Sequence, residues 1–142
     1  MADVNFTEKT ERERCIGNAV NFFLKPRRPD GHKGDFGKVC IIAGAKGMSG
    51  AAVLCARACM HAGAGLTYMV LPGALEPIAA AAVPEAGKCP AGGAETEFFG
   101  PEHIEYVKEL CREADAVVIG PGLGRKEETG GFVRGLLADP GF

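Results

Sequence analysis

Two glycine-rich turns carry the residues that are best suited to binding a ligand. One reads GAKGMSG at 44–50, and the other reads GPGLG at 120–124. Glycine loses more conformational freedom on folding than any other residue, so such clusters are typical of unusual turns or of backbone that approaches a ligand closely. Each turn stands between an apolar run and a helical pattern. Because a helix N-terminus exposes unpaired N–H groups and a partial positive charge, both turns would suit a phosphate or another anion.

Neither turn matches a specific nucleotide or nucleophile motif. The first is GxxGxxG, whereas dinucleotide-binding folds carry GxGxxG, and it lacks the GK[ST] of a P-loop. Ser49 is the only serine and lies in GMSGA, where Ala51 stands in place of the last glycine of a GxSxG nucleophile elbow. Ser49 is therefore predicted to cap a helix rather than to attack a substrate. A plain tight turn explains either loop alone equally well, but two loops at one sheet edge favour a ligand site.

The segments that must position these turns alternate between strands and helices. Short apolar runs predict three buried strands, at 38–44, 66–72 and 115–120. Helical patterns occupy 7–24, 51–63, 101–114 and 127–139, with a shorter helix after Pro77. Such alternation predicts an α/β fold with a mostly parallel sheet. Ligands of these sheets bind beyond the carboxyl ends of the strands, where both glycine turns should lie.

The number of predicted strands is small for such a sheet, because sheets average about 5–6 strands. One explanation is a missed strand, within 94–99. The preferred explanation is that residues 30–142 form the N-terminal half of a larger domain, while residues 1–29 are an N-terminal helix and a connector.

Composition excludes several classes of protein. Hydrophobic residues make up 46% and charged residues 24%, as in ordinary globular proteins. A net charge of -2 favours neither nucleic acid nor an anionic membrane as a partner. No apolar run approaches the ~20 residues that span a bilayer, and the charged N-terminus lacks a signal-peptide core, so a cytoplasmic protein is predicted. The six cysteines contain no CxxC, and neither a disulfide framework nor a metal site is expected.

Polar residues outside the turns receive structural interpretations. Arg57 and His61 are the only strongly polar side chains of 51–63, so this helix is predicted to be buried on most sides, and it permits a homo-oligomer contact. The segment HKGDFGK at 32–38 is predicted to be a solvated turn at the sheet edge opposite the ligand. His103, near a helix start, is predicted to be exposed.

The stretches HKGDFGKVCIIAGAKGMSGAAVLCARACMHAGAGLTYMVLP and ADAVVIGPGLG together resemble one known family. They are similar to the dehydratase domain of the NAD(P)H-hydrate repair enzymes, which are ADP- or ATP-dependent members of the ribokinase-like superfamily. The first block is specific, whereas GPGLG alone is a weak signal that agrees in order and spacing. The resemblance implies an incomplete ribokinase-like three-layer sandwich with a mostly parallel sheet.

The resemblance also implies a metabolite-repair reaction. NADH and NADPH can take up water at C6 of the nicotinamide ring, which gives a hydrate without redox activity. The family restores the S epimer with ADP or ATP and Mg²⁺: the hydroxyl is phosphorylated, and phosphate is then eliminated. The implied partner is this small-molecule substrate, and an epimerase, sometimes fused at the N-terminus, interconverts the two epimers.

Site residues are carried over by the same resemblance. The GMSGA turn would contact the hydrate, and GPGLG would supply backbone contacts; the residues are Ser49, Gly50, Ala51, Gly120, Gly122 and Gly124.

The family's catalytic aspartate belongs to a later GTGD-type motif, which would lie beyond Phe142 together with a nucleotide-binding stretch. None of Asp35, Asp115 or Asp139 stands in that context. No catalytic residue is therefore assigned, and this chain alone is expected to be inactive. Two alternatives stay open: another ribokinase-like small-molecule kinase, which would phosphorylate without elimination, and a non-catalytic half-domain completed by a partner chain.

Overall fold

The computed structural model describes residues 27–138, and the chain divides into two compact units, Met1–Gly31 and His32–Phe142. The predicted helix at 7–24 and Asp139 lie outside the described residues. In the described end of the first unit, the Gly31 N–H donates to the carbonyl oxygen of Arg28.

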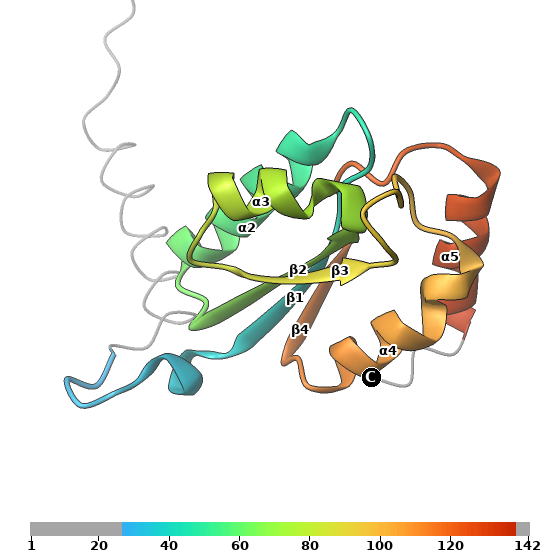
Figure 1. Ribbon diagram of the computed structural model, residues 1–142. Helices are drawn as coiled ribbons and strands as arrows, with labels where there is room; N and C mark the ends of the chain where they lie inside the picture. The colour runs from blue at the N-terminus through green and yellow to red at the C-terminus, as the bar shows by residue number, and fades with distance from the viewer. Residues whose placement is uncertain (1–26, 139–142) are drawn as a thin grey trace, which may run out of the picture. The chain divides into compact units, whose positions relative to one another are not determined.

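The second unit is built on a parallel sheet (Figure 1). Its described strands have the order β3-β2-β1-β4. Their bounds are Lys38–Ile42 for β1, Leu66–Pro72 for β2, Gly87–Ala91 for β3 and Ala116–Ile119 for β4. In the register of the sheet, Ile41 of β1 is aligned with Met69 of β2 and with Val118 of β4. The predicted α/β class with a parallel sheet is confirmed.

Helices cover both faces of this sheet (Figure 1). On one face lie α2 (Ser49–Ala62) and α3 (Glu76–Ala82), and on the other lie α4 (Ile104–Arg112) and α5 (Glu127–Ala138). Short 3-10 turns precede β1, α3 and α4: η1 (Lys33–Phe36), η2 (Gly73–Leu75) and η3 (Pro101–His103). Among residues 27–138, no helix has both the length and the apolar character that crossing a membrane requires.

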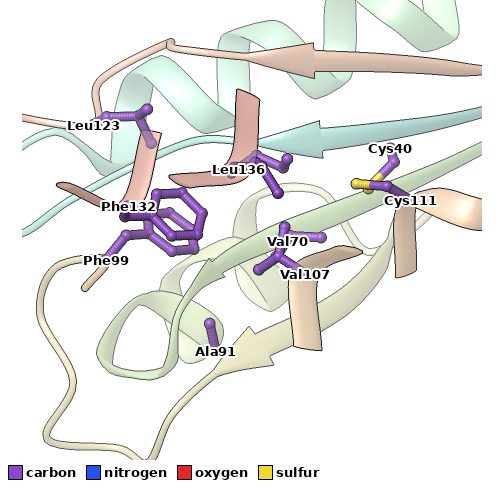
Figure 2. Close-up of a cluster of buried hydrophobic side chains, with 10 residues drawn as sticks. Cys40, Val70, Ala91, Phe99, Val107, Cys111, Leu123, Phe132 and Leu136 are labelled. Atoms are coloured by element: carbon purple, nitrogen blue, oxygen red, sulfur yellow. The ribbon is translucent and has the colours of Figure 1, made fainter. Parts of the chain in front are cut away.

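Alternation along β1 divides the buried side chains between two cores. Ile41 packs with the side chains of α2 and α3, while Cys40 and Ile42 pack with those of α4 and α5. This two-sided burial is typical of parallel strands that carry helices on both faces. In the second core, the rings of Phe99 and Phe132 stack with centroids 4.8 Å apart (Figure 2). The stack joins α5 to the segment that follows β3.

The strand that sequence patterns miss is β3, at Gly87–Ala91 and not within 94–99. Its sequence, GKCPA, holds a glycine, a lysine and a proline, which strands generally avoid. Pro90 is tolerated because β3 pairs only with β2, and an edge strand leaves one side of its backbone without ladder bonds. Residues 94–99 form an irregular segment instead, in which the Thr96 N–H donates to the carbonyl oxygen of Gly93.

The helix after the first glycine turn begins earlier than predicted. Ser49 is its first residue and not its cap; Met48 holds the cap position without a side-chain hydrogen bond. The shift arises because the Met48 N–H already donates to the carbonyl oxygen of Ala45, which closes the turn before the helix. Gly63 ends α2 in the left-handed conformation, as its position predicts.

Two expectations about burial are wrong. The outer side of α2 is open, since Leu54 is 68% exposed and only Ala52 and Ala56 of this helix are buried. Arg57, on that same helix, donates from Nη2 to the carbonyl oxygen of Ala82. His103 is buried, because its Nδ1 accepts from the Gly100 N–H and its ring meets Phe99 edge-on.

The five cysteines within residues 27–138 are free thiols. Cys111 and Cys40 face each other with 3.8 Å between their sulfur atoms (Figure 2). The hydrogen bond with Cys111, and then burial, raises the pKa of Cys40 well above the usual range of a thiol. Burial also raises the pKa of Cys55 and of Cys89.

These raised pKa values predict that the free energy of unfolding falls at alkaline pH. As the pH rises past the ordinary thiol pKa of about 8.5, the unfolded chain releases protons that the folded chain still holds, so the folded state loses stability. We expect a lower urea midpoint at about pH 10 than at about pH 7, and a smaller loss in a Cys55→Ala/Cys89→Ala variant. A fall of equal size in that variant would assign the alkaline loss to other groups.

Candidate functional site

The two glycine turns meet at the carboxyl edge of the sheet. The Gly44 N–H donates to the carbonyl oxygen of Pro121 at 2.9 Å, which ties the first turn directly to the second. The Gly120 N–H donates to the carbonyl oxygen of Ile42 at 3.2 Å, which continues the pairing of β4 with β1 into the turn. The expectation that both turns lie side by side at this edge is confirmed.

Ala51 and Gly122 bring the two glycine turns into contact with each other. Gly122 has a φ of +68°, and a Cβ built on it would lie 2.7 Å from the Cβ of Ala51 and 2.9 Å from the carbonyl oxygen of Met48. Real Cβ atoms do not approach so closely, so only glycine permits this contact between the turns. The first turn of α2 therefore packs against the backbone of GPGLG.

Gly50 and Gly120, by contrast, open onto free space. A Cβ built at either position would meet no described atom within 4 Å. Packing against Ala51 therefore explains why residue 122 is a glycine. Gly50 and Gly120 have no such explanation, and they leave backbone that a ligand could approach. Gly124 lies between these cases, with a φ of +85° and the Met48 side chain 3.3 Å from its built Cβ. Ser49 begins α2 beside Gly50 and is half-buried.

A third segment, residues 92–99, joins the site and was missed by sequence reasoning. The Lys46 N–H donates to the carbonyl oxygen of Glu97 at 2.9 Å, and the Lys46 ammonium pairs with the Glu97 carboxylate. The aromatic ring of Phe98 lies near Gly124. Sequence reasoning missed this segment because it missed β3, the parallel strand at 87–91 that delivers Gly92 and Gly93 to the same edge as the two glycine turns.

The second turn leads into α5 and bounds a hollow of about 440 Å³. Its lining is formed by Gly120, Leu123, Gly124, Arg125, Lys126, Thr129, Gly130, Val133 and Arg134. The Lys126 ammonium lies 3.7 Å from the ring centroid of Phe98, a cation–π contact. The Thr129 hydroxyl donates to the carbonyl oxygen of Phe99 at 3.0 Å, which fixes the start of α5 to the third segment.

Two aspartates near β1 accept backbone hydrogen bonds at the opposite edge of the sheet. Asp115 accepts from the Lys38 N–H through Oδ2 at 2.7 Å, and Asp35 accepts from the His32 N–H at 3.0 Å. Both carboxylates fix backbone at the amino end of the strands, where HKGDFGK was expected. Within the described part of the chain, no three His, Cys, Asp or Glu side chains gather as a metal ion would require.

Comparison with known proteins gives one family. A family model described as NAD(P)H-hydrate dehydratase matches residues 39–139. A bifunctional NAD(P)H-hydrate repair enzyme of Thermofilum pendens is 38% identical over 110 residues, which are 75% of this chain and 20% of that protein. An ADP-dependent (S)-NAD(P)H-hydrate dehydratase of Listeria monocytogenes is 38% identical over 112 residues, 79% of this chain and 37% of that protein.

Solved structures agree with this likeness. An ADP/ATP-dependent NAD(P)H-hydrate dehydratase of Bacillus subtilis, co-crystallised with ATP and Mg²⁺, superposes with a TM-score of 0.62 at 26% identity, covering 81% of this chain and 38% of that one. A ribokinase-like superfamily protein of Enterococcus faecalis gives a TM-score of 0.65 at 29% identity, covering 80% of this chain and 36% of that one. The chain thus spans well under half the length of these relatives.

Proposed function

The chain belongs to the NAD(P)H-hydrate dehydratase family, and from that membership we propose that it forms part of an enzyme that returns (S)-NAD(P)H hydrate to NAD(P)H. Residues 30–142 would be the N-terminal half of the dehydratase domain, and residues 1–29 a preceding helix and connector. The observation that carries the proposal is the meeting of the two glycine turns through Gly44 and Pro121 at the carboxyl edge of the sheet. Such an edge is where α/β folds bind nucleotides.

The proposed reaction is a phosphorylation followed by an elimination. The hydroxyl oxygen at C6 of the hydrated nicotinamide ring takes the terminal phosphoryl group of ADP, and AMP leaves. The bond between C6 and that oxygen then breaks, inorganic phosphate departs with the bonding electrons, and a proton is lost from C5 as the ring double bond forms again. With ATP as the donor, the leaving nucleotide is ADP.

Within this reaction, the described residues would bind and orient the hydrate. Gly120, Gly122 and Gly124 would offer backbone to the substrate, and Ser49, Gly50 and Ala51 would form the facing wall. Phosphoryl transfer depends mainly on positioning and on charge stabilisation, so backbone held in one conformation is a useful contribution. The contact between Ala51 and Gly122 supports this arrangement because it fixes the distance between the two walls.

The phosphoryl donor belongs to the same proposal. A relative is named as ADP-dependent and another was crystallised with ATP and Mg²⁺, which supports ADP or ATP as the donor for this family member. Among residues 27–138, no three His, Cys, Asp or Glu side chains gather that could hold Mg²⁺ without the phosphates of a substrate. No step is therefore assigned to the metal here. A cytoplasmic location and a homo-oligomer remain part of the proposal.

The proposal is tested by incubating the purified protein with NADH hydrate and ADP. We expect NADH, AMP and phosphate in equal amounts from a protein that contains the complete domain, and none of them without a donor nucleotide. From residues 1–142 alone we expect no turnover.

Product analysis separates the alternatives. A stable phosphorylated product from another small molecule would favour a kinase without an elimination step. A complete domain that leaves the hydrate unchanged with both ADP and ATP would contradict the proposed function.

A further inference from the structure

The hollow at the start of α5 is lined by cations that have few partners. Arg125, Lys126 and Arg134 all border it. The Lys126 ammonium is held over the ring of Phe98. Among residues 27–138, neither arginine forms an ion pair within 4.0 Å, although Glu127 and Glu128 are close in sequence. Neither glutamate lines the hollow. Two guanidinium groups that border one hollow and have no ion-pair partner among residues 27–138 favour an anionic ligand.

One glycine of α5 leaves room for the Arg134 guanidinium beside the hollow. A glycine inside a helix destabilises it relative to alanine, yet α5 contains Gly130, Gly131 and Gly135. Gly135 has a packing reason, because a Cβ built there would lie 2.5 Å from the Ile104 side chain, whereas one built at Gly131 would be in ordinary contact with Pro101 at 3.4 Å. At Gly130, the nearest side-chain atoms belong to the guanidinium of Arg134, whose Nη1 lies 3.2 Å from the built Cβ. The missing side chain leaves room for that guanidinium one turn back along the helix.

The hollow also adjoins the proposed substrate site. Gly120 and Gly124, which were assigned to substrate binding above, form part of its wall. A volume of about 440 Å³ lies within the usual range of small-molecule sites. Guanidinium groups match phosphate oxygens in a two-pronged geometry.

We propose that Arg125 and Arg134 bind a diphosphate group in this hollow. The inference rests on the proposed function for its choice of ligand, because both the hydrated dinucleotide and ADP carry a diphosphate. The arginines would hold this group while the glycine turns take the remainder of the molecule. Their role is binding and positioning, and neither touches the bond that breaks.

The test uses inorganic pyrophosphate as a probe of the full chain, followed by amide chemical shifts in NMR spectra. We expect saturable shifts at Gly120, Gly124 and Gly130. An Arg125→Gln/Arg134→Gln variant should bind pyrophosphate at least about tenfold more weakly, since charge-assisted hydrogen bonds to both groups are lost. The matched control is Arg112→Gln, an exposed arginine of α4 that does not line the hollow, and its affinity should be unchanged.

A Gly130→Ala variant gives an independent check. The added methyl group should raise helix stability, while it moves the Arg134 guanidinium by a few tenths of an ångström and weakens pyrophosphate binding about twofold. If Gly130 had only a structural role, helix stability and the affinity for pyrophosphate would not change in opposite directions. Stability that rises with unchanged affinity would contradict the role given to Arg134.

Separate titrations with ADP and with NADH identify the source of the diphosphate. The nucleotide whose shifts at Gly120 and Gly130 depend on the two arginines is the natural occupant. The inference is overturned if pyrophosphate causes no saturable shift at the hollow, if the double variant binds it as tightly as the unmodified chain, or if neither nucleotide depends on the arginines. Because binding is measured without turnover, a failure here leaves the dehydratase proposal standing, and a failure of the hydrate assay leaves this result standing.

Discussion

Replacing Phe132 with alanine is expected to lower the free energy of unfolding by about 3–5 kcal/mol, the usual cost of deleting a buried phenylalanine ring. Phe132 is fully buried, and its ring stacks on Phe99 with an interplanar angle of 12° (Figure 2). The deletion would remove the transfer free energy of the ring and leave a cavity between α5 and the segment at 92–99. The measurement is a urea titration followed by circular dichroism.

A control on the same helix makes this prediction specific. Leu137 is 56% exposed, so Leu137→Ala should change the free energy of unfolding by no more than about 0.5 kcal/mol. Both variants put alanine into α5, which makes their helix propensities alike. Equal effects of the two substitutions would mean that the aromatic stack does not hold α5 to the segment at 92–99.

Gly122→Ala is expected to destabilise the protein by about 2–5 kcal/mol and to separate the two glycine turns. Two costs combine: a left-handed backbone carrying a Cβ costs about 1–2 kcal/mol, and overpacking against Ala51 and Met48 costs about 1–3 kcal/mol. The separation would show in hydrogen exchange, because the Gly44 amide is protected by its bond to Pro121. We expect that amide to exchange faster in the variant than in the unmodified chain.

Gly47→Ala is the matched control for this substitution. Gly47 has a φ of +81°, close to that of Gly122, but a Cβ built there meets no described atom within 4 Å. The control therefore carries the backbone cost without the overlap, and it should destabilise by about 1–2 kcal/mol and leave Gly44 protected. If both alanine variants lose the same stability and the same protection, the contact between the turns is not what holds them together.

Local patterns predict the strands well where the side chains themselves favour a pleated strand. The runs at β1, β2 and β4 are rich in valine, isoleucine and other apolar residues, and they fall where the sequence places them. Pairing with β2, and not local preference, makes β3 a strand, since GKCPA has no such pattern. A strand that depends on its neighbour is invisible to a method that considers one segment at a time.

The site was predictable in its location and not in its details. Topology alone brings 44–50 and 120–124 to one edge, because the carboxyl ends of parallel strands meet there. The bond from Gly44 to Pro121 and the contact of Ala51 with Gly122 depend on tertiary packing, which no local pattern encodes. His103 shows the same limit: its burial follows from a bond with the Gly100 N–H and from contact with Phe99.

The bond between Gly44 and Pro121 also sets an order of events during synthesis. The first three strands occupy one side of the sheet, β3-β2-β1, and can pair while residues beyond 91 are still being made. The remaining neighbour of β1 is β4, and Pro121 follows it. The ribosome adds about 5–20 residues per second, so the first glycine turn waits several seconds for its partner. The nascent chain can therefore pair three of the four described strands before the two glycine turns can meet.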